Sequence, residues 1–398
     1  MTRPRLLDLT RSLRRAGRTA TGVDRVELAY LARFLFRDAP VFGLVRTPLG
    51  YLLLDKAALA DFEEKIRGKR PFGAASLLSR LADSRDDAIK RAESDLRQRA
   101  IARIRRGRLA AVLKTRLPGG FDYYNVGHSN LTHRVLTSVA AAGGRINVLV
   151  HDMIPLEYPE LQRDGSVEPF EAKMRRVSAQ ADRVIYNSHA TRDSAERFFR
   201  DWGRVPDAIV AHLGTVKPKP DPKGLPAGLP PAQPYFVTVG TIEPRKNHRF
   251  LLDIWEALGG DAPPLLICGR RGWKNEDVFA RLDALPPGGP IREVAGLDDP
   301  ALAFLVGRSA GMLFPSVAEG FGLPPVEAML LGTRVLCNDL PVLHEFLGAK
   351  AVYASVDDHY RWTRTVTSWA KEPPDAPKNQ NFSAPTWENH FKTVLSLQ

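Results

Sequence analysis

Two glutamates eight positions apart are the residues of this sequence most suited to binding a hydroxylated ligand. Glu319 and Glu327 lie in the stretch Pro-Ser-Val-Ala-Glu-Gly-Phe-Gly-Leu-Pro-Pro-Val-Glu-Ala-Met, residues 315–329. Its glycines permit close backbone approach, and Pro324 and Pro325 suit the first turn of a helix. A helix start attracts anions, and carboxylates accept hydrogen bonds from hydroxyls. The stretch therefore predicts a ligand with hydroxyls at both ends and phosphates in the middle, such as a nucleotide sugar.

A second candidate site lies in the run Thr-Val-Gly-Thr-Ile-Glu-Pro-Arg-Lys-Asn, residues 238–247. We expect a strand to end at Gly240 and a helix to begin near Lys246, which would present free backbone N–H groups to an anion. Arg245 and Lys246 add positive charge where the helix dipole is already positive, which is locally unfavourable. A bound phosphate or diphosphate would remove this conflict. A solvated basic turn is the alternative.

Strand-like runs alternate with helical patterns in both halves of the chain, which indicates two units with parallel sheets. The expected strands are residues 6–9, 121–126, 146–150, 183–186, 235–239, 265–268, 291–295, 311–314, 334–337 and 351–354. The proline-rich run at residues 216–234 cannot form a helix or a central strand.

These patterns predict an α/β fold with two Rossmann-like, doubly wound domains. The first domain would span residues 1–215, the linker 216–234, the second domain 235–375 and a terminal segment 376–398. Two such domains face each other across a cleft and bind ligands at the carboxyl ends of their strands.

Composition points to a cytosolic, soluble protein. Of the 398 residues 44% are hydrophobic, which is enough for real cores. No apolar run reaches the length of a membrane span, and the N-terminus has no secretory signal. Cys268 and Cys337 each sit in an apolar stretch, so we expect two buried, reduced thiols.

The net charge of +12 is concentrated in residues 65–117, which hold 16 Lys and Arg against 5 Asp and Glu. Such a segment suits a polyanionic partner. We expect mainly helix from about residue 86 to 113, with an apolar stripe that would let it lie on an anionic membrane surface. An ordinary domain helix with a solvated basic face is the alternative. No nucleic-acid partner is expected, because aromatic platforms are missing among the basic residues.

The run from Glu319 to Glu327 resembles the Glu-x7-Glu motif of retaining glycosyltransferases of family 4, the glycosyl transferases group 1, which have the GT-B fold. The run at residues 240–247 resembles the diphosphate loop of the same family. Residues 21–25, 124–128 and 150–155 resemble loops and strand ends that line the cleft. The resemblance implies two Rossmann-like domains and a C-terminal helix, anchored by Trp387, that returns to the first domain.

The resemblance also implies roles for matching residues. Arg245 and Lys246 would neutralise the diphosphate of the donor, all the more because Thr241 stands where many members carry arginine. Glu319 would bind hydroxyls of the transferred sugar and Glu327 the ribose. Further donor contacts would come from Gly240, Gly320, Phe321, Gly322 and Leu323.

On the acceptor side the resemblance places His151 near the anomeric carbon, together with Gly22, His128 and Asp152. Both histidines have a purely structural role as the alternative. The resemblance implies four catalytic residues for sugar transfer: His151, Glu319, Arg245 and Lys246. Glu319 would act as a binding and orienting group.

The implied function is retaining transfer of a hexose from a nucleotide-diphosphate sugar to a glycan or lipid-linked saccharide, in bacterial cell-surface polysaccharide or lipopolysaccharide synthesis. The Gly-Leu-Pro-Pro form of the motif favours GDP-mannose, and UDP- and dTDP-sugars remain open. No Asp-x-Asp triplet occurs, so we expect no metal and no cofactor besides the donor. The protein would be cytoplasmic, or peripheral at the inner face of the plasma membrane. The alternatives are a nucleotide-sugar epimerase on the same fold and a nucleic-acid-binding protein acting through residues 65–117.

Overall fold

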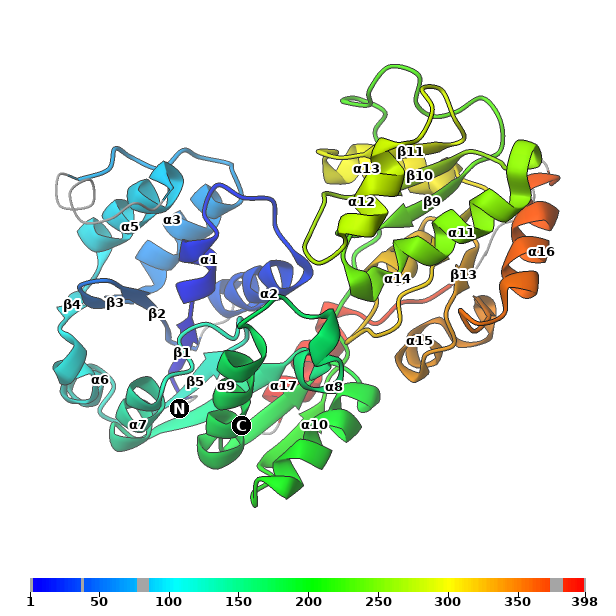
Figure 1. Ribbon diagram of the computed structural model, residues 1–398. Helices are drawn as coiled ribbons and strands as arrows, with labels where there is room; N and C mark the ends of the chain where they lie inside the picture. Colours follow the sequence, from blue (N-terminus) through cyan, green and yellow to red (C-terminus); the bar gives the residue numbers. More distant parts are fainter. Residues whose placement is uncertain (1–2, 37–38, 77–85, 373–381, 397–398) are drawn as a thin grey trace.

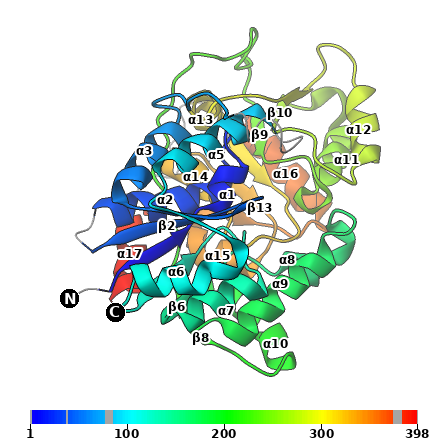
Figure 2. The same cartoon turned by 90° about the vertical axis from the view of Figure 1, so that its left-hand side faces the viewer.

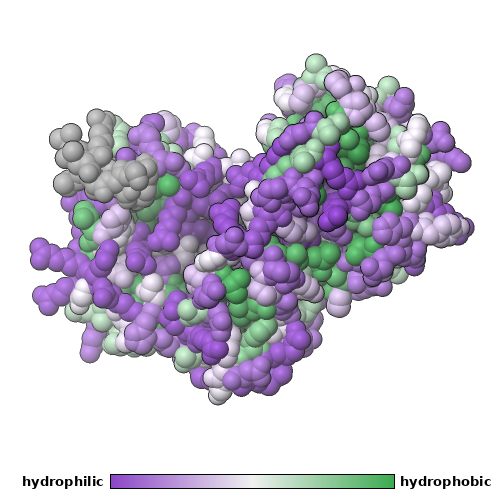
Figure 3. All heavy atoms as spheres, viewed as in Figure 1, coloured by the Kyte–Doolittle hydropathy of each residue, from purple (hydrophilic) through white to green (hydrophobic). Residues whose placement is uncertain are grey.

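The computed structural model describes residues 3–36, 39–76, 86–372 and 382–396. The chain forms two α/β lobes, each built around its own sheet (Figure 1). A hollow with mostly hydrophilic walls separates the lobes on the face shown in Figure 3. The predicted architecture of two Rossmann-like domains is therefore confirmed.

The first sheet has eight strands in the order β4-β3-β2-β1-β5-β6-β7-β8. The strands from β2 through β1 and β5 to β8 are parallel, whereas β3 pairs antiparallel with β2 and β4. Both β1 and β5 are buried along their whole length, as expected of parallel strands covered on both faces. The strands are β1 Arg5–Asp8, β2 Val41–Thr47, β3 Gly50–Leu54, β4 Ala102–Ile104, β5 Phe121–Asn125, β6 Gly144–Val150, β7 Arg183–Tyr186 and β8 Asp207–Val210.

Helices surround this sheet, and three of them start at a side-chain cap. Asp55, Thr132 and Ser188 accept hydrogen bonds from backbone N–H groups at the starts of α3, α7 and α10. The helices are α1 Thr10–Arg14, α2 Gly22–Phe36, α3 Lys56–Ile66, α5 Asp87–Arg99, η1 Arg106–Arg108, α6 Leu109–Arg116, α7 His133–Ala141, α8 Ile154–Glu157, η2 Pro159–Leu161, α9 Val167–Gln180 and α10 His189–Asp201.

The second sheet has six parallel strands in the order β11-β10-β9-β12-β13-β14. The strand order reverses at β9, which lies between β10 and β12, and such switch points bind ligands in α/β folds. The strands are β9 Phe236–Val239, β10 Leu265–Cys268, β11 Ile291–Val294, β12 Gly311–Phe314, β13 Val335–Cys337 and β14 Val352–Tyr353. The helices are η3 Pro244–Lys246, α11 His248–Leu258, η4 Gly259–Asp261, α12 Glu276–Asp283, α13 Asp299–Arg308, α14 Leu323–Leu330, α15 Pro341–Leu347, η5 Gly348–Lys350 and α16 His359–Ala370.

The C-terminal helix α17, Trp387–Leu395, returns to the first domain as expected (Figure 2). Tyr30 of α2 is hydrogen-bonded to His390 at 2.8 Å and packs edge-on against Phe391. Trp387 instead lies against the segment that leaves the first domain, since a Cβ added to Gly214 would stand 2.2 Å from the Trp387 nitrogen. Residues 376–381 and 397–398 of the predicted terminal segment lie outside the described residues.

The prediction of one helix over residues 86–113 is wrong. Helix α5 ends at Arg99, and Ala100 is extended. Ile104 then belongs to strand β4, where it pairs with Tyr51 and is buried. The apolar stripe of α5 packs into the core of the first domain, so it is not available to a membrane surface. Residues 77–85 of the basic segment lie outside the described residues.

Two smaller expectations also need correction. Helix α2 begins at Gly22, so the expected turn at residues 21–25 is already the start of a helix. Helix α11 begins at His248 rather than near Lys246, which closes a separate 3-10 turn. Cys268 and Cys337 are buried free thiols, as predicted. Within the described residues no helix combines the length and apolarity needed to cross a bilayer.

Candidate active site

The turn after β9 places two cations at the carboxyl end of the second sheet. Gly240 has φ of 150°, and a Cβ there would stand 3.3 Å from the Lys246 side chain. The glycine therefore lets Lys246 fold back over the strand end, where its Nζ lies 4.7 Å from the centre of the Phe314 ring. Asn247 adopts the left-handed conformation that ends this turn and opens α11.

The loop after β12 brings Glu319 to the same place. Gly322 has φ of 88°, which favours glycine, and it precedes α14 with its two prolines in the first turn. Gly320 approaches the first domain so closely that a Cβ would stand 2.2 Å from the His151 carbonyl oxygen. Ser188 and Thr191 donate to the Gly320 carbonyl at 3.1 and 3.2 Å. The loop is therefore held by both domains.

Arg245, Lys246 and Glu319 form a compact cluster of opposite charges. Glu319 Oε1 lies 2.8 Å from Arg245 Nη1 and 2.5 Å from Lys246 Nζ. Arg245 also contacts Glu243 at 2.8 Å and donates to the Ala318 carbonyl at 2.8 Å. The Glu319 side chain is only 8% exposed. The three predicted catalytic residues of this domain thus meet at one point.

The pKa of Glu319 shows how strongly the cations act on it. Burial alone would raise this pKa, but Arg245 and Lys246 outweigh burial and lower it to about 2. For Arg245, burial opposes the charge, and Glu319 and Glu243 reverse that effect and raise the pKa. Glu319 is therefore the carboxylate that compensates the charges of two buried cations.

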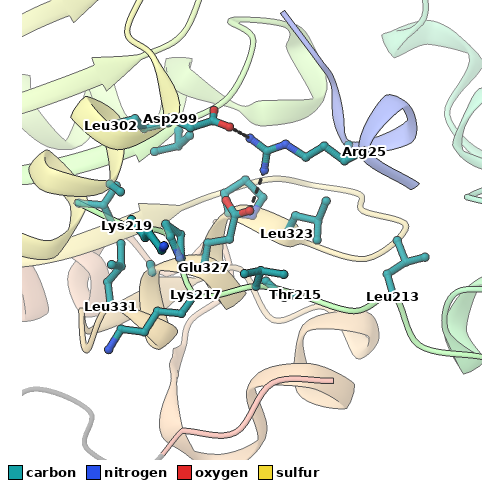
Figure 4. Close-up of a pocket in the computed structure, with 18 of the residues that line it drawn as sticks. Arg25, Leu213, Thr215, Lys217, Lys219, Asp299, Leu302, Leu323, Glu327 and Leu331 are labelled. Atoms are coloured by element: carbon teal, nitrogen blue, oxygen red, sulfur yellow. Dashed lines mark hydrogen bonds and ion pairs between the residues drawn. The ribbon is translucent and has the colours of Figure 1, made fainter. Parts of the chain in front are cut away.

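Glu327 lies apart from this cluster and contacts the first domain. Its Oε1 accepts from Arg25 Nη1 at 2.8 Å, and Arg25 Nη2 contacts Asp299 at 2.9 Å (Figure 4). Burial raises the pKa of Glu327, and Arg25 offsets part of that rise. These groups line a cavity of about 330 Å³ with Leu323 and Lys217. A carboxylate offers about four acceptor positions, so the contact with Arg25 leaves Glu327 able to accept further hydrogen bonds.

The predicted acceptor-side histidines lie together at the ends of β5 and β6. The rings of His128 and His151 are 5.0 Å apart, and His128 adopts φ of 55°. His151 Nε2 lies 2.7 Å from the Val126 carbonyl oxygen, which only accepts, so Nε2 carries the proton. Burial lowers the pKa of His151 to about 4. The ring is therefore neutral at pH 7, with Nδ1 as the acceptor nitrogen.

The other predicted residues fall into different surroundings. Asp152 accepts from the Ile154 N–H at 3.2 Å, and burial raises its pKa. The Phe321 ring packs 3.9 Å from the Phe346 ring and is buried, so its side chain serves the core. Gly22 lies against α14, because its Cβ would stand 3.2 Å from the Leu323 side chain.

Comparison with known proteins identifies the class of fold and the family model that the second domain matches. Across 99% of this chain and 95% of the other, the structure matches HepE from Anabaena in complex with UDP and glucose, with a TM-score of 0.61 and 17% identity. The chain therefore has the GT-B fold of glycosyltransferases. The model for glycosyl transferases group 1 matches residues 226–384, which include all six strands of the second sheet.

Curated relatives extend the similarity into the first domain. The serotype-specific mannosyltransferase WbdA of Escherichia coli is 29% identical over 278 residues, which is 65% of this chain and 34% of WbdA. The O-antigen chain mannosyltransferase B of Escherichia coli is 34% identical over 129 residues, 32% of this chain and 34% of that protein. The chain thus spans about a third of the length of these relatives. The resemblance inferred from the Glu319 motif is confirmed.

Sequence reasoning named Arg25 within a motif but gave it no role, and it overlooked Glu243. Glu243 stands two positions before Arg245 in the diphosphate loop, so the spacing of opposite charges was a usable signal. The contact between Arg25 and Glu327 joins residues 302 positions apart, and no local pattern predicts it.

Proposed function

We propose that the chain transfers a hexose from a nucleotide-diphosphate sugar to a glycan or lipid-linked saccharide, with retention of configuration and without a metal at the donor. The observation that carries this proposal is the cluster of Arg245, Lys246 and Glu319 at the carboxyl end of the second sheet. The mannosyltransferase names of the relatives favour mannose, and hence GDP-mannose, as the donor.

In this proposal the donor diphosphate replaces Glu319 as the partner of the two cations. Glu319 is then released to accept hydrogen bonds from hydroxyls of the sugar, which stands next to the diphosphate. The bond between the anomeric carbon and the diphosphate oxygen breaks, and its electron pair leaves with the phosphate. Two preorganised cations in a buried site stabilise that charge most where it develops, in the transition state.

The acceptor hydroxyl attacks from the face that the diphosphate leaves, and its proton passes to the departing phosphate oxygen. His151 is neutral at pH 7, so it would orient a sugar hydroxyl through Nδ1 and would not supply a proton. In this proposal the second domain handles the charge of the leaving group, and both Glu319 and His151 orient hydroxyls.

A thermal-shift panel of GDP, UDP, dTDP and their sugars tests the proposal. A nucleotide that binds the folded chain raises the melting temperature by mass action, and we expect the largest rise with GDP. With GDP-mannose and a saccharide acceptor we expect a product of α configuration by NMR, at a rate that EDTA leaves unchanged. Interconversion of the donor without an acceptor would instead support the epimerase. Absence of any nucleotide effect would overturn the donor site.

A further inference from the structure

Three possible metal ligands converge where the chain leaves the first domain. His189 is the first residue of α10, His212 follows β8, and Glu345 lies on α15 of the second domain. One ligand atom from each residue lies within 4.8 Å of the other two. His212 Nε2 is 2.7 Å from Glu345 Oε1, and the rings of the two histidines are 5.9 Å apart.

The role of Glu345 at the start of α10 does not account for both histidines. Glu345 accepts from the N–H groups of His189 at 2.8 and 3.0 Å and of Ala190 at 3.4 Å. Ser188 already caps this helix by accepting from the Thr191 N–H at 3.0 Å. These bonds involve the backbone N–H of His189. Its imidazole therefore takes no part in capping the helix. The same bonds fix the two Glu345 oxygens, as hydrogen bonds around metal ligands commonly do.

The cluster is open to solvent on one side. It borders a cavity of about 580 Å³, which Thr386 and Asn389 also line. His189 is exposed, whereas His212 and Glu345 are half-buried. Arg192 lines the same cavity, where its guanidinium is held by Asp193 at 2.8 Å. A hydrated ion can therefore enter, and water can complete its coordination.

We propose that His189, His212 and Glu345 bind one divalent transition-metal ion of the zinc class, with water as the fourth ligand. Two imidazoles and a carboxylate are a common zinc set, and imidazole suits Zn²⁺, Co²⁺ and Ni²⁺. Ligand atoms about 2.0–2.2 Å from a tetrahedral ion stand about 3.3 Å apart, which small side-chain rotations reach from the observed separations. The ion lies outside the Arg245, Lys246 and Glu319 cluster and takes no part in sugar transfer.

The proposed ion has a conformational consequence that is independent of the donor chemistry. His189 belongs to the first domain and Glu345 to the second, so an ion bound to both favours the domain arrangement seen here, in which the two residues are in contact. A ligand that binds one arrangement better shifts the equilibrium toward it. Zinc is thus expected to slow domain opening and to protect the linker at residues 216–234.

Titration of the full chain with Co²⁺ and with Zn²⁺ tests the site. We expect one ion per chain, with the visible absorption bands of tetrahedral Co²⁺. His212→Ala and Glu345→Gln should each weaken binding at least tenfold, whereas His344→Ala should not. His344 is a matched control, because it precedes Glu345 on α15 and pairs with Asp339. Arg192→Gln should tighten binding by removing a nearby positive charge.

Circular dichroism shows whether each variant is folded, and His212→Gln provides a polar replacement if His212→Ala is not. The proposal is overturned if the folded chain binds no stoichiometric ion, or if the His212 and Glu345 variants bind as tightly as the parent. The conformational part is overturned if zinc leaves proteolysis of the linker unchanged in a chain shown to hold the ion.

Discussion

The second domain keeps the buried Glu319 ionised, whereas the first domain keeps the buried Glu27 and His151 neutral at pH 7. In the second domain Arg245 and Lys246 hold the pKa of Glu319 down to about 2. In the first domain burial raises the pKa of Glu27 to about 8 and lowers that of His151 to about 4. Asp24 is an exception, since Arg11 and Arg15 pair with it at 2.7 and 2.5 Å.

The two domains differ in ionisation because their buried carboxylates have different partners. Glu319 meets two cations, so it stays charged in spite of burial. Among the described residues, Glu27 accepts from Ser12 alone, through its N–H at 2.8 Å and its hydroxyl at 2.5 Å. These bonds offset only part of the effect of burial. An ionised face suits a diphosphate that must exchange partners, and a neutral face suits an acceptor that presents hydroxyls.

The largest effect is expected from the ionised face. Lys246→Ala removes one of two cations from the leaving group, so transfer should fall by about 100- to 1,000-fold and GDP should bind more weakly. Glu319→Gln removes the group that competes with the diphosphate. It should therefore bind GDP at least as tightly as the parent while transfer is lost.

Calorimetric titration with GDP, together with GDP release from GDP-mannose, separates the two variants. Arg281→Gln is a suitable control, because Arg281 pairs with Asp253 at 2.5 Å and is not part of the Arg245, Lys246 and Glu319 cluster. Equal loss of GDP binding in Glu319→Gln and Lys246→Ala would show that Glu319 does not compete with the diphosphate.

The next effect concerns the neutral face. The folded state holds the Glu27 proton up to about pH 8, whereas an unfolded glutamate releases it near its ordinary pKa of about 4.3. The native state therefore loses stability as pH rises through this window, by up to about 1.4 kcal/mol per pH unit. Glu27→Gln removes that loss, so its stability relative to the parent should increase by a few kcal/mol between pH 5 and 8.

Urea unfolding at several pH values measures this difference. Parallel pH profiles for the parent and Glu27→Gln would mean that Glu27 is ionised in the folded chain. In that case the two faces of the cleft would not differ at this position.

The alternation of strands and helices in the sequence predicted most of the fold. The pattern of charges predicted the site residues of the second domain but none of the contacts between the domains. The strand predicted at residues 183–186 matches β7, and that at 311–314 matches β12. The hairpin of β2 and β3 was missed, because the parallel-sheet rhythm contains no antiparallel edge. The helix prediction ran past Arg99 because Ala100 and Ile104 continue a helical spacing by coincidence.

Within the site, the sequence predicted that Arg245, Lys246 and Glu319 would all serve the donor. It did not predict that Glu319 pairs directly with both cations, which lie more than 70 positions away in the chain. Burial of Glu27, by contrast, depends on Gly127, where a Cβ would stand 2.1 Å from a Glu27 oxygen. Such contacts follow from packing between β5 and α2, which no spacing in the sequence encodes.

A smaller effect is expected where the two faces touch. Gly320→Ala places a Cβ 2.2 Å from the His151 carbonyl oxygen, so backbone must move and the bonds from Ser188 and Thr191 are strained. We expect a loss of about 1–3 kcal/mol in unfolding free energy and weaker GDP binding. Gly307→Ala is the matched control, since its Cβ meets nothing nearer than 3.9 Å inside α13, and alanine should add about 0.5–1 kcal/mol there. Thermal unfolding of both variants, with and without GDP, would show no such contrast if the domains were not in contact at Gly320.

The smallest effect on stability is expected outside the cleft, where the first domain carries its basic surface. Arg103, Arg105 and Arg106 are exposed. Within the part of the chain that the structure describes, Arg103 donates to the Arg97 carbonyl oxygen and Arg106 to that of Pro48. Changing all three to glutamine should leave the unfolding free energy within about 0.5 kcal/mol. Binding to anionic vesicles should still weaken, by about 1 kcal/mol per charge at low salt. These charges differ from those in the cleft, because no buried carboxylate among the described residues pairs with them. An external polyanion could therefore serve as their partner. Co-sedimentation with phosphatidylserine vesicles measures this, with neutral vesicles as the control, and unchanged binding would leave the basic surface as a solvated face.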